Sequence, residues 1–236
     1  MADPWVRLSE EARLAWAQSP LGDLSARATA YVLQGAVEDH LPDGSPLPPG
    51  AANPGQDTVL LLVVSGLIRT YRRHGVRQVT TRYAEEGDFV GVPSAIRHGS
   101  SANGEVVSEA HIVRMVASRL RELVRHDASA AWVVMRELVH LHDTAVAMTC
   151  DNVFLTVRQR VAVHLLDLAV RESDGLVVYA SHQNIADAIG SVREVVSRVL
   201  RELKAEGLVD RAGERILLSR PPDLHRLVAG GLRAAR

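Results

Sequence analysis

The chain has 236 residues, with 27 Lys and Arg against 28 Asp and Glu and a formal net charge of −1. Apolar residues at 47% and charged residues at 23% exclude a disordered chain, and the length suggests one large domain or two modest ones. The single cysteine, Cys150, excludes an internal disulfide framework, a Cys-rich zinc site and an iron–sulfur cluster held by four cysteines of one chain.

The charge is divided unevenly along the chain. From Asn152 onward there are 13 basic and 10 acidic residues, a net of +3, so the remainder carries 14 and 18, a net of −4. The C-terminal third is therefore the basic part. No run of about 18 apolar residues occurs, and the first residues lack a basic region followed by an apolar core. We therefore expect a cytoplasmic protein with no membrane partner.

The N-terminal part predicts one helix, one extended segment and one long loop. The helix covers Trp5–Gln18, with Ser9 as its N-cap. Residues Thr29–Val37 are predicted to be extended. The stretch His40–Gln56 contains five prolines and three glycines, which predicts an exposed loop without regular structure.

Short strands follow. Residues Thr58–Tyr71 are rich in β-branched and apolar side chains and are interrupted at Ser65-Gly66, which predicts two strands around a tight turn. Further strands are predicted at Arg77–Tyr83, Phe89–Val92 and Glu105–Val116. Several short strands separated by Gly-containing turns favour a β-sandwich or barrel.

The period of the pattern then changes to that of helices, predicted at Ser118–Arg125, Ser129–Asp151 and Thr156–Arg171. Within and just beyond the second of these, a stripe recurs at spacings of three and four, as in a coiled-coil seam: Trp132, Met135, Val139, His142, Val146, Thr149 and Val153. This stripe predicts either pairing with a second chain or packing on the strand domain, and the pattern alone favours neither.

Two short helices follow, joined at a glycine. Ser181 is the predicted N-cap of the first helix, Gly190 ends it, and Ser191 is the predicted cap of the second. The buried side of the second helix is predicted to consist of Val192, Val195, Val196, Val199, Leu200 and Leu203. A hairpin predicted at Asp210–Leu218, with Gly213 at its tip, makes this a winged helix-turn-helix.

The exposed side of the second helix carries Arg193, Glu194, Ser197, Arg198 and Arg201. Arg pairs with guanine and Glu accepts from cytosine in the major groove, which makes the face suited to reading bases. The alternative is a solvated face on which Glu194 pairs with Arg198 at i, i+4. The winged motif and the basic third favour the DNA interpretation.

No arrangement of residues typical of catalysis is present. The segment Gly87–Gly91 lacks the Lys and the helix of a phosphate-binding loop. His140 and His142 lie two residues apart and face different ways on one helix, so they are not expected to share a metal ion. We therefore expect neither an enzyme nor a metal site.

The segment Phe154–Ala169 and the block Ser181–Leu208 resemble the Crp/Fnr family of bacterial transcription regulators. Arg193, Glu194 and Arg198 match the recognition helix of its cAMP-receptor branch, and Glu194, Ser197 and Arg198 match that of its oxygen-sensing branch. The resemblance implies an α+β fold with three parts. These are an N-terminal double-stranded β-helix or jelly roll (1–128), a long dimerisation helix with a hinge (129–153) and a C-terminal winged helix-turn-helix (154–236).

The resemblance breaks down at the cyclic-nucleotide cassette. The family's Gly-Glu-Leu is Gly91-Val92-Pro93 here, and Ala102-Asn103-Gly104 stands near its Arg-Ser position. A cyclic phosphate buried without an Arg would be unpaired, so we expect no cAMP binding in the family manner. Ala145 and Val146 also replace the polar pair that contacts adenine. A different anion could use Gly91, Arg97 and His98, although a mobile loop is the favoured interpretation.

No cofactor is expected. The oxygen-sensing iron–sulfur cluster needs several cysteines, and haem, which some family members ligate through His, is the less favoured alternative. Its candidate ligands His74, His98, His111 and His142 are isolated from one another along the chain.

The sequence therefore predicts a homodimeric, sequence-specific regulator of transcription that binds a pseudo-palindromic site in double-stranded DNA and contacts RNA polymerase. The predicted dimer seam comprises Trp132, Met135, Val139, His142, Val146 and Thr149. Bases are to be read by Arg193, Glu194, Ser197 and Arg198. Phosphates are to be contacted by Ser181, His182, Gln183, Arg201, Arg211 and Arg215. The alternatives are a sensor whose DNA binding is switched by an unidentified small molecule or haem, and a structural dimer without DNA binding.

Overall fold

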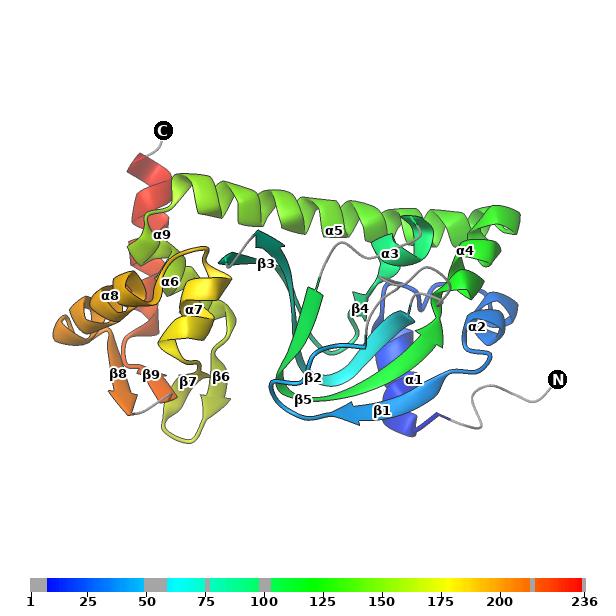
Figure 1. The fold of residues 1–236 in the computed structure, drawn as a ribbon, viewed down its shortest axis with the longest axis horizontal. Coiled ribbons are helices and arrows are strands. Elements are labelled where there is room, and N and C mark those ends of the chain that lie inside the picture. Colours follow the sequence, from blue (N-terminus) through cyan, green and yellow to red (C-terminus); the bar gives the residue numbers. More distant parts are fainter. Residues whose placement is uncertain (1–7, 49–58, 75–76, 98–102, 213–214, 235–236) are drawn as a thin grey trace. The chain divides into compact units, whose positions relative to one another are not determined.

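The computed structural model describes residues 8–48, 59–74, 77–97, 103–212 and 215–234 (Figure 1). Two compact units divide the chain. The N-terminal unit comprises Met1–Arg72 and Thr81–Ala145, and the C-terminal unit comprises Arg73–Thr80 and Val146–Arg236. The chain thus passes between the units after Arg72, after Thr80 and again after Ala145, which lies inside one long helix. The three-part division predicted from the sequence stays a prediction.

The N-terminal unit is built around an antiparallel sheet in the order β1-β5-β2-β3, with β4 paired to β2. Its elements along the chain are α1 (Glu10–Gln18), α2 (Ala26–Val32), β1 (Val37–Leu41), β2 (Val59–His74), β3 (Arg77–Ala84), β4 (Phe89–Val90), α3 (Val92–Arg97), β5 (Asn103–Val116), α4 (Ala117–His126) and α5 (Ala128–Phe154).

Both N-terminal helices begin after a serine. The Ser9 side chain accepts a hydrogen bond from the Ala12 backbone N–H at 3.1 Å, which confirms the predicted cap of α1. Ser25 caps α2 in the same way. The extended segment predicted at Thr29–Val37 is therefore wrong, because the Ser25 cap and the burial of the helix face outweigh the β-propensity of Thr29.

Strand β2 runs unbroken through Ser65-Gly66, where the sequence predicts a turn. Gly66 has φ +90°, and a Cβ added there would lie 2.2 Å from the carbonyl oxygen of Glu109. The pairing of β2 with β5 shifts register on both sides of this point. The glycine therefore forms a bulge that bends one long strand and does not end it.

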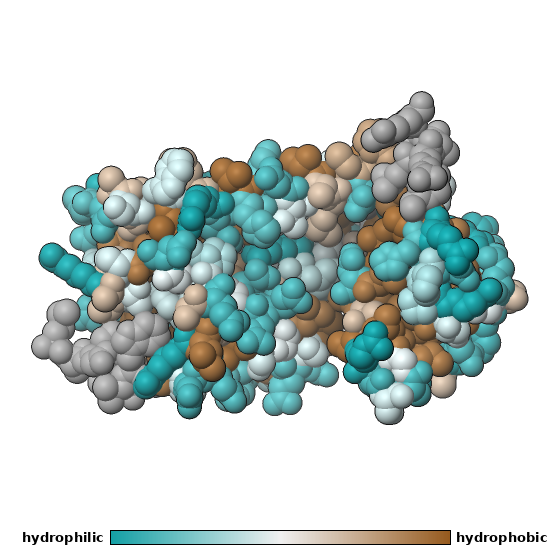
Figure 2. Space-filling model, turned by 180° about the vertical axis from the view of Figure 1, so that it is seen from behind, coloured by the Kyte–Doolittle hydropathy of each residue, from teal (hydrophilic) through white to brown (hydrophobic). Residues whose placement is uncertain are grey.

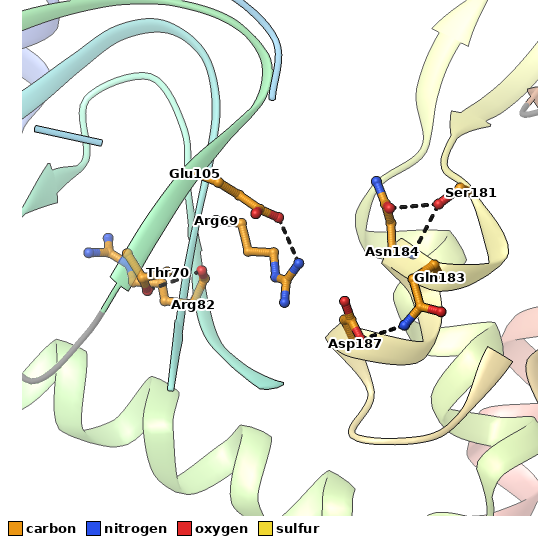
Figure 3. A network of polar contacts seen from close by, with 8 residues as sticks. All are labelled: Arg69, Thr70, Arg82, Glu105, Ser181, Gln183, Asn184 and Asp187. Atoms are coloured by element: carbon orange, nitrogen blue, oxygen red, sulfur yellow. Dashed lines mark hydrogen bonds and ion pairs between the residues drawn. The ribbon is translucent and has the colours of Figure 1, made fainter. Parts of the chain in front are cut away.

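The core of the N-terminal unit lies between this sheet and the helices. Trp16 of α1 meets Phe89 of β4 edge to face, with 5.7 Å between the ring centroids. The strand predicted at Phe89–Val92 ends at Val90, because α3 begins at Val92. A cross-strand ion pair joins buried Arg69 of β2 to Glu105 of β5 at 2.7 Å (Figure 3).

The C-terminal unit is a small helical domain with a four-stranded sheet in the order β6-β7-β9-β8. Its further elements are α6 (Val157–Asp167), β6 (Val170–Glu172), β7 (Gly175–Tyr179), α7 (His182–Ala188), α8 (Arg193–Ala205), β8 (Val209–Ala212), β9 (Arg215–Leu218) and α9 (Pro221–Ala234). The helix predicted to reach Arg171 ends at Asp167. Strands β6 and β7 and helix α9 were not expected from the sequence pattern.

The predicted fold class is confirmed: an antiparallel sheet N-terminally and a helix-turn-helix followed by a hairpin C-terminally. Within the described residues, no helix has the length and apolar character needed to cross a bilayer.

Candidate nucleic-acid interface

Helices α7 and α8 form the helix-turn-helix. The Ser181 side chain accepts from the Asn184 backbone N–H at 3.1 Å, which confirms the predicted cap. Gly190 has φ +66°, and the Ser191 N–H donates to the Ala186 carbonyl at 2.8 Å to close the turn. The predicted Ser191 cap is wrong, because α8 begins after Val192, which makes no side-chain cap.

One side of α8 is buried and the other is charged. The buried side packs into the core of the C-terminal unit through Val196, Val199, Leu200 and Leu203. Val192, predicted to be buried, is 45% exposed because it stands before the first turn. Most of the predicted inner side is therefore confirmed. The helix is fixed by its apolar side and leaves the opposite side to solvent.

The exposed side begins with Arg193 and Glu194 and continues with Arg198 and Arg201. Glu194 and Arg198 both belong to the described part of the chain, and they do not form the i, i+4 ion pair that the solvated-face alternative requires. The Arg201 Nε donates to the Ser197 backbone carbonyl at 3.3 Å. The structure therefore gathers the predicted base-reading residues on one helix face, and the charged ends of Arg193, Glu194 and Arg198 form no hydrogen bond or ion pair with any other residue in the described ranges.

His182 joins three elements. Its Nδ1 lies 2.5 Å from the Ser197 hydroxyl of α8, and its Nε2 meets the guanidinium of Arg211 on β8. Burial, and then the charges of Arg211 and Arg193, hold the pKa of His182 below its usual range. The sequence predicts that these residues lie near DNA, but it does not predict their mutual contact, because Ser197 and Arg211 lie 15 and 29 residues from His182 in the chain.

Two further residues predicted to contact phosphate, Ser181 and Gln183, form hydrogen bonds with side chains of α7 (Figure 3). The Ser181 hydroxyl donates to the Asn184 carboxamide oxygen at 2.6 Å, and the Gln183 amide donates to Asp187 at 2.8 Å. Ser181 is therefore engaged by the helix that it caps. The Gln183 side chain is exposed, so its amide can exchange partners with little loss.

The hairpin β8–β9 carries the remaining two predicted phosphate contacts in different environments. Arg215 on β9 donates to Asp174 at 2.6 Å and to Glu172 at 3.1 Å. The bonds with Asp174 and Glu172 raise the pKa of Arg215, and the bond from Arg215 lowers the pKa of Asp174. Two carboxylates thus offset the charge of Arg215, whereas the guanidinium of Arg211 donates to the uncharged His182 ring.

The predicted dimer seam lies along α5. Trp132 is 63% exposed, Met135 51%, Val139 55% and Val146 45%, and His142 and Thr149 are exposed as well. Apolar side chains reach the surface at several places on the face drawn in Figure 2. The alternative, in which this stripe packs on the strand domain, is wrong. The covered side of α5 carries other residues, among them Val133, Val134 and Glu137.

Of the predicted effector residues, Gly91 joins β4 to α3, Arg97 is exposed at the end of α3, and His98 lies outside the described residues. Nearby in the N-terminal unit, Arg82 forms an ion pair with Asp88 and donates to the Phe89 carbonyl at 2.9 Å. Both carboxylate oxygens of Glu137 are buried and have no hydrogen-bond partner among the described residues.

Of the haem candidates, His111 and His142 have described side chains, and these two stand in different environments. His111 is buried and pairs through Nε2 with Glu38 at 2.6 Å, and its ring stacks on that of His40. His142 is exposed on α5, and His98 lies outside the described residues. Across the described ranges, no group of three or more His, Cys, Asp or Glu side chains is placed to hold a metal ion.

Known proteins share sequence similarity with this chain. Residues 159–227 match the Crp-like helix-turn-helix domain family. Over 164 residues the chain is 32% identical to the transcriptional regulator LdrP of Thermus thermophilus, covering 67% of this chain and 81% of that protein. It is 28% identical over 152 residues to the cAMP-activated global transcriptional regulator Vfr of Pseudomonas aeruginosa, covering 60% of this chain and 71% of Vfr.

Two solved structures extend the similarity to the fold. One is a transcriptional regulator of the CRP family from Thermus thermophilus, with TM-score 0.67 and 26% identity over 81% of this chain and 96% of that one. The other, described as a putative regulator of the Crp/Fnr family from Eubacterium rectale, has TM-score 0.76 and 21% identity over 90% of this chain and 99% of that one.

Proposed function

This chain belongs to the Crp/Fnr family of transcription regulators, and we propose that it acts as a homodimer whose two α8 helices enter adjacent major grooves of a pseudo-palindromic DNA site. The family is one of DNA-binding regulators and not of enzymes. The observation that carries the proposal is the uncommitted charged side of α8, which begins at its first residue.

The residues proposed to read bases lie at the N-terminal end of the charged side of α8. A recognition helix contacts base edges through its N-terminal residues, because these reach deepest into the groove. Arg193 and Glu194 occupy the first turn, and Ser197 and Arg198 occupy the next. Arg suits the two acceptors of guanine, and Glu suits the amino group of cytosine.

Phosphate contacts are assigned to the rim of the same surface. Arg201 is exposed one turn beyond Arg198, and Gln183 is exposed on α7. Ser181, His182 and Arg211, which the sequence also predicted to contact phosphate, already make hydrogen bonds inside the protein. Arg215 is the weakest member, since Glu172 and Asp174 offset its charge.

The exposed apolar stripe of α5 is the surface proposed to bind the second copy of the chain. Apolar side chains left in water at spacings of three and four cost free energy that pairing with an identical helix recovers. A two-fold dimer predicts half-sites about one helical turn, ~34 Å, apart. RNA polymerase is a further proposed partner. The proposed hinge lies near Asp151–Phe154.

The decisive experiment is selection of bound genomic fragments, followed by fluorescence anisotropy on the best fragment and on a scrambled version. We expect the selected fragment to bind at least about a thousandfold more tightly, with log K falling linearly with log salt. Equal affinity for both fragments would exclude sequence-specific regulation. Absence of a salt slope would favour a structural dimer without DNA binding.

A sensor of a small molecule is the second candidate function, and the name of the relative Vfr, a cAMP-activated regulator, favours it. The cassette of this chain argues against cAMP, because Val92 stands where the family has its ribose-binding Glu and no Arg matches the phosphate ligand. Neither cAMP nor haem is therefore proposed as a cofactor. Calorimetry with cAMP and cGMP tests the prediction on cyclic nucleotides, and micromolar binding of either nucleotide would overturn it.

A further inference from the structure

In the two hydrogen bonds that join His182 to Ser197 and Arg211, the donor and the acceptor can be assigned. A guanidinium carries only donors and stays charged, so Arg211 donates and the His182 Nε2 must accept. A neutral imidazole that accepts at Nε2 carries its proton on Nδ1. The Nδ1–H therefore donates to the Ser197 hydroxyl oxygen over 2.5 Å.

This direction determines what Ser197 offers to DNA. One lone pair of its oxygen accepts from the ring, so its own O–H is not used in this bond and can donate to a phosphate oxygen or to a base acceptor. The guanidinium of Arg211 is meanwhile held on β8 with its charge intact, because a neutral ring offsets none of it. His182 thus aligns one side chain of the recognition helix and one of the wing.

A proton added to the ring would remove this arrangement. The imidazolium has two donors and no acceptor, so Arg211 would lose its acceptor and face a like charge. The charged groups that act on the ring are Arg211 of β8 and Arg193 of α8, and both are cations. Both therefore favour the neutral ring. In this state His182 links Ser197 to Arg211 through its two ring nitrogens, an arrangement called the His182 bridge below.

We propose that neutral His182 is a positioning residue that holds Ser197 and Arg211 in place for DNA, so that its protonation weakens sequence-specific binding. This proposal rests on the proposed DNA-binding function. The expected change of DNA affinity with pH is opposite to that of a simple phosphate contact, because a histidine that binds phosphate strengthens DNA binding when it becomes charged.

The first measurement is specific DNA affinity between pH 7.5 and pH 5.5 at constant salt, for the wild-type chain and for His182→Gln. Gln offers a neutral acceptor and donor that do not titrate. We expect wild-type affinity to fall about tenfold as the pH falls, relative to His182→Gln, whatever the affinity of the variant at pH 7.5. His225→Gln, which removes an exposed histidine of the same unit, should keep the wild-type profile.

The second variant, His182→Arg, places a permanent cation at the site. The bridge predicts lower specific affinity than His182→Gln at pH 7.5, whereas a phosphate contact predicts higher affinity. Affinity that rises as the pH falls in the wild type, or a stronger His182→Arg, would overturn the proposal.

Nitrogen-15 NMR of the free protein tests the bridge without DNA. We expect the His182 ring at pH 7.5 to show a protonated Nδ1 and an unprotonated Nε2. The opposite tautomer would overturn the proposal even if DNA binds. A protein that shows the expected tautomer but no specific binding at any pH would refute the proposed function and leave the bridge intact.

Discussion

Helices α5 and α8 each leave one side in water, and the two sides differ in chemistry. That of α5 is mostly apolar, with Trp132 and Val139 more than half exposed, and that of α8 begins with Arg193 and Glu194. An exposed apolar stripe is costly unless a protein covers it, whereas an unpaired charged face is stable in water and suits a polyanion. This difference is the basis of the two proposed partners, a second chain for α5 and DNA for α8.

The covered sides of the two helices differ as well. The inner side of α8 is apolar throughout, whereas that of α5 includes Glu137. This residue is only 2% exposed, and its carboxylate has no hydrogen-bond partner among the described residues. Burial raises the pKa of Glu137, while the charges of Arg82 and His140 act in the opposite direction. The long helix is therefore the less stably packed of the two at this point.

The largest effect is expected from Val139→Asp in the exposed stripe of α5. A charge at the seam of a coiled coil should prevent pairing, and loss of bivalent binding should weaken DNA affinity by about 100-fold or more. Sedimentation velocity and anisotropy measure the two effects. Ala147→Asp, an exposed change outside the stripe, should leave both unchanged. A Val139→Asp chain that remains dimeric would break the assignment of α5.

Next in size is Arg193→Ala on α8. Loss of a bidentate contact to guanine should cost about 1–3 kcal/mol per half-site and relax the preference at one base pair. Anisotropy on the selected fragment, its single-base variants and scrambled DNA measures this. The same loss on every sequence would make Arg193 a phosphate contact.

Glu137→Gln tests the covered side of α5. The pKa of Glu137 is raised in the folded chain, so the folded chain holds its proton at pH values where the unfolded chain has released it. Stability should therefore fall as the pH rises from the ordinary glutamate pKa to the raised one. Removing the charge should add about 1 kcal/mol to the free energy of unfolding at pH 8.

That gain should disappear at a pH below the ordinary glutamate value. Urea unfolding of the wild-type and variant chains, compared at each pH, measures the difference. A variant less stable than the wild type at pH 8 would mean that the carboxylate has a partner in solution.

The smallest effect is expected from Arg201→Ala, at the rim of the charged side of α8. Loss of one phosphate contact should weaken binding to all sequences alike and reduce the salt slope by about one for each subunit. Arg215→Ala should change the slope less, because Asp174 and Glu172 already offset that charge. A larger effect from Arg215 would show that DNA displaces these carboxylates.

Local patterns account for what could be predicted. The caps Ser9 and Ser181 and most of the inner side of α8 follow from neighbours within four residues, and these predictions are confirmed. One local prediction, the Ser191 cap of α8, is wrong, and the larger failures lie where packing or pairing with distant residues decides. Thr29 is helical because its face is buried, and Gly66 continues a strand because β5 pairs on both sides of it.

The candidate site divides in the same way. By itself the sequence determined which side chains stand on the exposed face of α8, since helical periodicity places them there wherever the helix lies. Only the tertiary structure decided which polar groups meet. It brings His182 to Ser197 and Arg211, and Arg215 to Glu172, across 15 to 43 residues of chain. Such pairs depend on how helices and strands pack, and no local spacing encodes them.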